Sequence, residues 1–318
     1  MRNSDNNASK GNLGYLYYRE YYKVEKDKNS IVVSVNTDVD NKLIKYQYKE
    51  NNFKHLSKIN RDNMNTFILK TTYPGLIIGS GYMHSIKNDD EFKLGFYFDY
   101  TTGLPIIPGS SVKGMIRSVF RKALYNENDF NEIGEHLKEV KSEMQKYFQQ
   151  VFKLINKKLV DSNNKDKKVK AIIKENDIIL LSSNSSDNEA NIENSITLEE
   201  LSMEMFEGKM MGDSKKYINV PVYKRDIFFD ANVNIKKNND KVILADDYIT
   251  PHKNPLEEPK PLKFLKIAPD VNIEFQFSLK DDTKGIVTSK VKEELFKRII
   301  KDFGIGAKTT VGYGYLEE

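Results

Sequence analysis

The spacing of hydrophobic residues predicts short strands separated by single amphipathic helices. Strand-like patterns occupy residues 65–82, 91–100, 218–233, 241–250 and 261–280. Pro74-Gly75 marks a turn inside the first of them. Helical spacing occupies 103–124 and 289–304, and no repeat of 20–50 residues is present. Alternation of this kind favours an α+β fold built on an antiparallel sheet.

The pattern changes between residues 126 and 217. Residues 131–159 have the period of an amphipathic helix, whereas 161–170 and 182–195 are polar and typical of solvated loops. We interpret 126–217 as a partly helical insertion within a domain that spans 65–318. Residues 1–64 then form an N-terminal extension, and its tyrosine-rich run "NLGYLYYREYYKV" predicts that it packs on the domain.

The helix predicted within 103–124 has one apolar face and one basic face. Its apolar positions follow the i, i+3, i+4, i+7 spacing of a buried face, and Ser110 or Ser111 can cap its start. On the opposite side Lys113, Arg117 and Arg121 lie four residues apart and form one stripe. A solvated face is the ordinary interpretation of such a stripe. The helix start offers N–H groups and a positive dipole end to an anion, so a phosphate backbone lying along this helix would use both features.

The C-terminal segment "GIGAKTTVGYG" is a glycine-rich loop that follows a helix. It is not a P-loop, because Ala307 stands where that motif needs the glycine before its lysine. The dinucleotide fingerprint fails as well, because Thr309 replaces its third glycine. The loop still offers residues that suit a sugar-phosphate chain. These are Gly306, Lys308, Thr309, Thr310 and Tyr313.

Composition adds limits but no activity. The chain has 318 residues, a net charge of +4 and no cysteine, so disulfides and thiolate metal sites are excluded. No apolar run approaches the length of a membrane span, and the N-terminus has no signal-peptide pattern. A cytoplasmic location is the expectation. Net charge alone does not indicate a nucleic-acid partner.

Several segments, taken in order, resemble the RAMP superfamily of CRISPR proteins. The two that carry most of the resemblance are "IPGSSVKGMIRSVFR" and the terminal "GIGAKTTVGYG". The segments "NLGYLYYREYY", "LIIGSG", "RDIFFDA", "DDYITPH" and "PLKFLKIAPDVNIEF" extend it, so that it covers roughly 12–22, 65–124 and 218–316. Within the superfamily the chain is most similar to the small subunit that caps the type III-B (Cmr) effector complex. Residues 126–217 match nothing in it.

This resemblance implies a ferredoxin-like (RRM-like) core with a C-terminal glycine-rich loop. It implies a structural subunit that binds guide (CRISPR) RNA near the guide 3′ end, in antiviral defence, with no catalytic residue, cofactor or metal. The expected partners are the guide RNA, a neighbouring RAMP backbone subunit, a small helical subunit and, indirectly, target RNA. The aromatic signature of RRM sheets is absent, so recognition should be mostly of the RNA backbone.

Two alternatives remain at the level of the sequence. Some relatives are endoribonucleases, and His84 or the pair Asp89 and Asp90 could serve a loop-based site for guide processing or target cleavage, although exposed loop residues are usually only solvated. His252 matches a family motif without a known role. A protein scaffold without RNA contacts is the other alternative, and it leaves the basic stripe unexplained. The neighbours Asp246 and Asp247 point to opposite faces of a strand, which favours packing over a metal pair.

Overall fold

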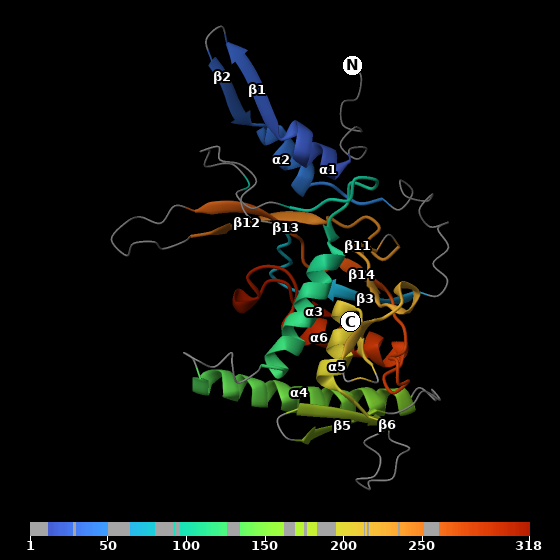
Figure 1. Cartoon of the computed structure of the whole chain (residues 1–318). Helices are drawn as coiled ribbons and strands as arrows, with labels where there is room; N and C mark the ends of the chain where they lie inside the picture. The colour runs from blue at the N-terminus through green and yellow to red at the C-terminus, as the bar shows by residue number, and fades with distance from the viewer. Residues whose placement is uncertain are drawn as a thin grey trace.

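The structure of the chain is a computed structural model (Figure 1). It describes residues 12–27, 30–49, 64–79, 92, 96–125, 134–161, 169–174, 177–182, 195–212, 214, 216–234, 236–250 and 261–318. Predictions that fall on His84, Asp89, Asp90 and His252 lie outside these residues.

The centre of the molecule is an antiparallel sheet. Its strands in chain order are β3 (Asn65–Thr71), β4 (Ile106–Ile107), β10 (Ile227–Phe228), β11 (Ala231–Val233), β14 (Asn272–Ser278) and β15 (Leu316–Glu317). Across the sheet the order is β15-β3-β14-β11-β4, and β10 pairs with β14. The sheet therefore brings together strands from both ends of the region that follows residue 64.

Two helices pack on one face of this sheet (Figure 1). They are α3 (Gly109–Ala123) and α6 (Ser289–Phe303). Alternate residues of β3 and β14 point toward them, and Phe67 stacks on Phe275 with ring centroids 5.3 Å apart. These aromatic side chains are buried, as expected for a half-buried sheet with one apolar face.

The opposite face of the sheet is polar by comparison. On β3 and β14 its side chains are those of Thr66, Ile68, Lys70, Asn272, Glu274, Gln276 and Ser278, of which Gln276 is buried. None of these residues is aromatic. The open face of β3 and β14 therefore offers no ring for base stacking.

The segment between α3 and β10 lies partly below the two helices (Figure 1). It contains α4 (Gly134–Asp161), β5 (Val169–Lys174), β6 (Asp177–Ser182), β7 (Ser195–Thr197), α5 (Leu198–Ser202), the π-helix η6 (Met203–Glu207), β8 (Lys209–Met211) and β9 (Tyr217–Asn219). The predicted amphipathic helix is present as α4, whose Phe148 ring lies 4.7 Å from that of Phe120 on α3. The strands β5 and β6, which pair as a hairpin, were not predicted.

The N-terminal part packs against the core. It contains α1 (Leu13–Tyr15), the π-helix η1 (Leu16–Glu20), β1 (Tyr22–Asp27), β2 (Ser30–Val35) and α2 (Thr37–Ile44). Tyr17 and Tyr21 are buried in the same hydrophobic cluster as the sheet and its helices. The backbone N–H of Gly14 donates to the carbonyl oxygen of Gly103 at 3.2 Å. The tyrosine-rich run thus packs on the core, while the hairpin β1–β2 projects from it (Figure 1).

Three local predictions can be compared with the structure. The described part of 91–100 forms an isolated bridge between Phe98 and Pro105 instead of a strand, with Phe96 and Phe98 buried and Tyr100 exposed. The stretch 218–233 is divided among β9, the 3-10 helix η7 (Val222–Lys224), β10 and β11. The predicted stretches 241–250 and 261–280 are confirmed as β12 (Leu244–Ile249), β13 (Leu262–Ile267) and β14.

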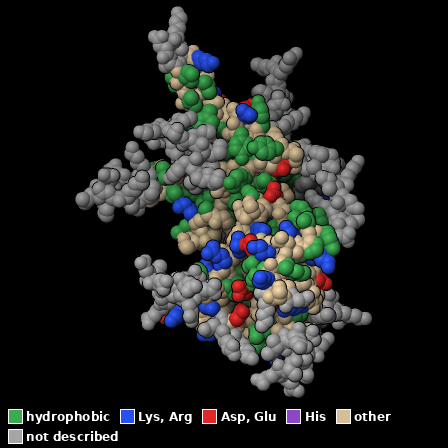
Figure 2. All heavy atoms as spheres, in the orientation of Figure 1, with side chains coloured by type: hydrophobic (Ala, Val, Ile, Leu, Met, Phe, Trp, Pro, Cys, Tyr) green, Lys and Arg blue, Asp and Glu red, His purple; other side chains and the backbone are tan. Residues whose placement is uncertain are grey.

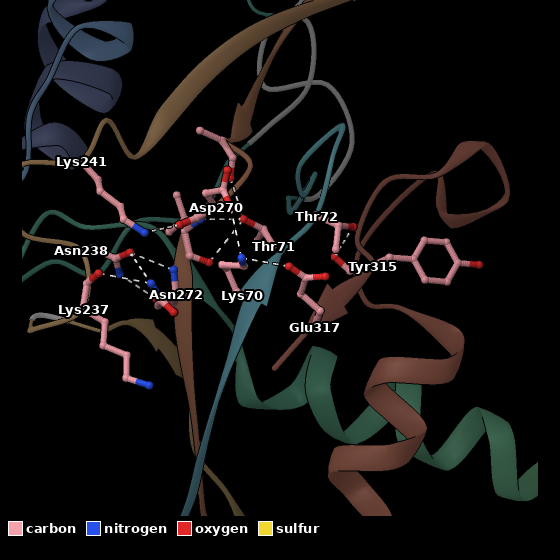
Figure 3. A network of polar contacts seen from close by, with 12 residues as sticks. Lys70, Thr71, Thr72, Lys237, Asn238, Lys241, Asp270, Asn272, Tyr315 and Glu317 are labelled. Carbon is pink, nitrogen blue, oxygen red and sulfur yellow. Dashed lines mark hydrogen bonds and ion pairs between the residues drawn. The ribbon is translucent and has the colours of Figure 1, made fainter.

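A polar network ties the end of β3 to the last residues of the chain (Figure 3). Lys70 forms ion pairs with Asp270 at 3.3 Å and with Glu317 at 2.9 Å. The N–H and the hydroxyl of Thr72 both donate to the carbonyl oxygen of Tyr315, each at 3.1 Å. These contacts hold β15 at the sheet edge, and so fix the exit of the glycine loop that precedes it.

Candidate nucleic-acid interface

The start of α3 differs from the prediction. The helix begins at Gly109, and its N-cap is Pro108, so neither Ser110 nor Ser111 caps it. Pro108 suits this place because its missing N–H is one that a helix start leaves unpaired. The N–H of Gly109 donates to Oδ1 of Asp230 at 2.7 Å. A carboxylate of the protein therefore already interacts with the positive end of this helix dipole.

Gly109 is required there, because an added Cβ would lie 2.4 Å from the carbonyl oxygen of Phe228. Gly114 is different. It is exposed, and nothing else in the described chain lies within 4 Å of a Cβ added there. Packing against a neighbouring helix, one explanation for a glycine inside α3, is therefore excluded for the described residues.

The basic stripe of α3 is partly committed to contacts within the chain. Arg117 forms an ion pair with Glu207 of η6. Nζ of Lys113 lies 5.9 Å from the centroid of the Phe228 ring, within the range of a cation–π contact. Arg121 is exposed. Figure 2 shows Lys and Arg side chains gathered across the middle of the face over which α3 lies in Figure 1.

The C-terminal glycine loop begins where α6 ends. Gly304 is the C-cap of α6, and its N–H donates to the carbonyl oxygen of Ile300 at 3.0 Å. The loop then runs beside the segment that follows β3, where the N–H of Ala307 donates to the carbonyl oxygen of Ile77 at 2.9 Å. It closes through a short 3-10 helix, η8 (Thr309–Val311), before β15.

The glycines of this loop serve its own path through the protein. Gly306 has φ +93°, and a Cβ there would lie 2.3 Å from the carbonyl oxygen of Ile77. Gly314 has φ +79°, and a Cβ would lie 2.0 Å from the carbonyl oxygen of Ile305. Several of the loop N–H groups, those of Ile305, Ala307 and Gly314 among them, donate to carbonyl oxygens of the chain. These N–H groups are therefore committed to contacts within the chain.

Tyr313 is an anchor of the loop and not part of its surface. Its side chain is only 8% exposed, and its ring packs edge-on against Phe264 with centroids 5.8 Å apart. Its hydroxyl donates to Oδ2 of Asp247 at 2.8 Å, and Nζ of Lys266 lies 5.7 Å from its ring centroid. The ring is therefore not available to stack on RNA. Sequence alone could not reveal this, because a tyrosine in a glycine loop can be either buried or exposed.

Lys308 has the opposite character. It is exposed and has φ +60°, a left-handed conformation that residues other than glycine rarely adopt. Among the described residues it forms no ion pair. A cation is thus held at the surface of the loop in a conformation that costs about 1 kcal/mol.

The glycine loop and α3 line one pocket, although they lie almost two hundred residues apart in the chain. The pocket has a volume of about 550 Å³. From the predicted site it contains Ser111, Gly306, Thr309 and Thr310. The structure therefore brings part of the predicted helix site and part of the predicted loop site together.

The stripe itself lies on another side of α3. The residues of α3 that line the pocket are Ser111, Met115, Ser118, Val119 and Lys122. Residues three or four apart lie on the same side of a helix, so each of these two sets follows one side of α3. The pocket side is a different one from the side that carries Lys113, Arg117 and Arg121. Ser110 is exposed beside the stripe and does not line the pocket. The pocket cation is Lys122, which the sequence reasoning missed although its spacing from Ser111 and Ser118 marks a second polar face.

One carboxylate among the described lining residues is partly neutralised. Asp302 accepts a hydrogen bond from Nε of Arg298 at 2.6 Å and another from the hydroxyl of Tyr147 at 2.9 Å. Burial and the nearby negative charge of Asp302 raise the pKa of Tyr147, so its hydroxyl stays a donor. The pocket therefore combines one lysine, several hydroxyls and a compensated carboxylate.

The pair Asp246 and Asp247 has a packing role, as predicted. Asp247 forms an ion pair with Lys266 in addition to its bond with Tyr313. Oδ2 of Asp246 lies 3.9 Å from Nζ of Lys263, which also forms an ion pair with Asp40 at 2.6 Å. Within the described part of the chain no group of three His, Cys, Asp or Glu side chains is placed to hold a metal ion.

Comparison with known proteins decides the family. The model of the RAMP superfamily matches residues 68–317. The chain belongs to the RAMP superfamily. Among curated proteins, no sequence matches it. None of the described helices has the length and hydropathy needed to cross a bilayer.

The solved structures that contain a chain similar to this one include two type III CRISPR complexes. The first is the cryo-EM structure of the type III-B Cmr-β complex bound to cognate target RNA, in which the similar chain is 17% identical, with a TM-score of 0.46. That similarity covers 98% of this chain and 91% of the other. The second is a Csm–crRNA–target RNA ternary complex of a type III-A CRISPR-Cas system, with 15% identity, a TM-score of 0.26 and coverage of 70% and 53%. Both are distant similarities.

Proposed function

We propose that this chain is a guide-RNA-binding structural subunit of a type III-B CRISPR effector complex, without catalytic activity of its own. In this proposal it caps the backbone of the complex near the guide 3′ end and contacts a neighbouring RAMP subunit and a small helical subunit. The observation that carries the proposal is the shared pocket of α3 and the C-terminal glycine loop in a chain of the RAMP superfamily.

The core fits this role as a ferredoxin-like unit. Four of its strands have the order β15-β3-β14-β11, with α3 between β3 and β11 and α6 between β14 and β15. This β-α-β-β-α-β sequence of elements is the ferredoxin-like arrangement. The insertion that carries α4 then lies between the first helix and the second strand of that unit.

The chemistry of the pocket favours the RNA backbone over the bases. Its polar groups are the hydroxyls of Ser111, Thr309 and Thr310 and the ammonium of Lys122, which suit phosphate and ribose oxygens. The open face of β3 and β14 carries no aromatic ring for base stacking. Guide sequence would therefore be read by base pairing and not by this protein.

Cations outside the pocket, on the glycine loop and on the basic stripe of α3, extend the path of a strand. Lys308 has a left-handed backbone conformation in which a glycine would be unstrained. A lysine at such a position supports a role for its charge. Arg121 offers a second exposed cation on α3. Arg117 is also available, since its exposed ion pair with Glu207 contributes no more than about 1 kcal/mol and phosphate can compete for it.

RNA–peptide crosslinking on the protein purified with its co-assembling partners tests the proposal. Crosslinks at residues 110–122 and 304–310 are the expected result. A stable complex that contains RNA but gives no crosslink in either segment would show a protein scaffold instead. Incubation of the same sample with labelled guide precursor and target RNA tests the endoribonuclease alternative, for which cleavage abolished by His84→Ala would be decisive.

A further inference from the structure

The tyrosines of the N-terminal run divide into two sets. Tyr17 and Tyr21 are buried at 2% and 1% exposure, and their nearly parallel rings lie 5.9 Å apart. Tyr15 and Tyr18 are more exposed. Tyr15 is 56% exposed, and Tyr18 is half-buried with its hydroxyl donating to the carbonyl oxygen of Phe96 at 2.7 Å. Core packing explains the first set but only part of the second, because Tyr18 packs partly on the core while Tyr15 lies mostly in solvent.

Tyr100 is the third outward-facing ring of this region and is 91% exposed. It stands on a tight turn that Asp99 organises. Oδ1 of Asp99 accepts hydrogen bonds from the N–H of Thr101 at 3.0 Å and the N–H of Thr102 at 2.6 Å. The N–H of Gly103 donates to the carbonyl oxygen of Asp99 at 2.7 Å. The turn therefore presents a large aromatic side chain to solvent from a fixed backbone.

These rings surround a pocket of about 250 Å³. The rings of Tyr18 and Tyr100 are nearly parallel, with an interplanar angle of 22° and centroids 6.4 Å apart. Phe98 meets Tyr18 edge-on at 88° and closes the inner side. The exposed guanidinium of Arg19 belongs to the same lining.

The lining favours a flat aromatic ligand. Among the described residues it consists of Asn12, Gly14, Tyr15, Tyr18, Arg19, Phe98, Asp99 and Tyr100 and has no aliphatic side chain. Aromatic rings and arginine planes are the groups on which proteins stack unpaired RNA bases. The volume is smaller than that of pockets for drug-sized molecules and suits a single ring system.

The position of this pocket connects it with α3. The turn that carries Tyr100 continues through β4 directly into α3 at Gly109, nine residues later. Nine residues span at most about 30 Å when fully extended. A strand held along α3 and the glycine loop can therefore reach the pocket within a few nucleotides beyond the start of that helix.

We propose that Tyr15, Tyr18, Arg19 and Tyr100 form a stacking site for one unpaired base of single-stranded RNA. The inference rests on the proposed function, and it adds a contact to a base where that function assigns contacts to the backbone. Because every base has a π face, the site tolerates any sequence. It holds a nucleotide outside the segment that pairs with target.

The absence of tryptophan from this chain makes a direct test possible. Tyr100→Trp introduces a single tryptophan into the full chain, and Tyr223→Trp is a matched control because Tyr223 is 75% exposed on η7. Each variant is titrated with fluorescein-labelled oligouridine and oligoadenosine RNA, and anisotropy reports binding. We expect RNA to quench the emission of Tyr100→Trp at the concentration at which anisotropy saturates, and to leave that of Tyr223→Trp unchanged.

Affinity gives a second readout. Tyr100→Ala should weaken RNA binding on the order of 10- to 100-fold, the loss expected for one stacked base, and Tyr100→Phe should retain most of the affinity. RNA that binds with unchanged affinity to Tyr100→Ala and leaves Tyr100→Trp unquenched would refute the stacking site and leave the proposed function standing. No RNA binding by the wild-type chain or its complex would refute both. Loss of a protein subunit from the Tyr100→Ala complex, with RNA affinity intact, would make the pocket a protein interface.

Discussion

The hydroxyl of Tyr313 donates a hydrogen bond to Oδ2 of Asp247 at 2.8 Å and so joins the C-terminal glycine loop to β12. The same carboxylate forms an ion pair with Lys266 of β13. Because the Tyr313 ring is buried against Phe264, the loop is held at its far end as well as by the cap of α6. The glycine loop is therefore a fixed wall of the pocket.

Tyr313→Phe tests this anchor. It removes the hydrogen bond to a charged acceptor and keeps the buried ring, so the free energy of unfolding should fall by about 1–2 kcal/mol. Urea denaturation measures the change. Tyr223→Phe is the control, because Tyr223 is 75% exposed, and its effect should stay within about 0.5 kcal/mol. Equal stability of the two variants would mean that the bond to Asp247 does not hold the loop.

Glycine substitutions should have opposite signs in the loop and in α3. Gly306→Ala places a Cβ against the carbonyl oxygen of Ile77 at positive φ and should destabilise by about 1–3 kcal/mol. Gly114→Ala places a Cβ in open space inside a helix and should stabilise by about 1 kcal/mol. Thermal denaturation of the two variants under one set of conditions measures both. A destabilising Gly114→Ala would contradict the open surface at that position.

Lys308→Gly separates charge from backbone strain. Glycine accepts the left-handed conformation, so stability should change little while RNA binding weakens. The slope of log K against log salt concentration should flatten by about 0.7 for the lost phosphate contact, and by about 1.4 when Lys122→Gln is added. Asp240→Gly, at another exposed residue with φ +60°, is the backbone control and should leave the slope unchanged. If the slope were unaltered in both lysine variants, Lys308 and Lys122 would not contact RNA phosphates.

The bond between Tyr313 and Asp247 should also depend on pH. Burial raises the pKa of Asp247, but hydrogen bonds from Lys266 and Tyr313 outweigh it and hold the pKa below its ordinary value. A carboxyl whose pKa is lower in the folded than in the unfolded state stabilises above the unfolded value, near 4, and this contribution is lost as pH falls through the folded value.

Asp247→Asn isolates that contribution. The difference in unfolding free energy between wild type and Asp247→Asn should be constant from pH 7 to 5 and shrink as the pH is lowered from 4 toward 2. Urea titrations at each pH measure it. The comparison with the variant is needed because burial raises the pKa of other carboxyls, including Glu204 and Asp226, whose effect on acid stability is opposite. A difference that does not shrink would show that Asp247 is not ionised in its folded contacts.

The sequence by itself determined the elements whose pattern is local. The buried face of α3 and the long helix α4 both follow from apolar residues at helical spacing. The α+β class followed from the alternation of strands and helices, whereas the helix of α3 and the terminal loop were singled out together by their resemblance to the RAMP superfamily. Local spacing is sufficient here because a helix or strand buries the same face in any tertiary context.

Tertiary structure decided which side chains of these segments can meet a ligand. The rotation of α3 on the core turns Ser111 and Lys122 toward the loop and the basic stripe toward Glu207. Packing against Phe264 buries Tyr313, whereas Tyr100 remains in solvent. A tyrosine or lysine is compatible with both environments, so its role depends on contacts made by residues far away in the chain. Only the folded chain sets those contacts.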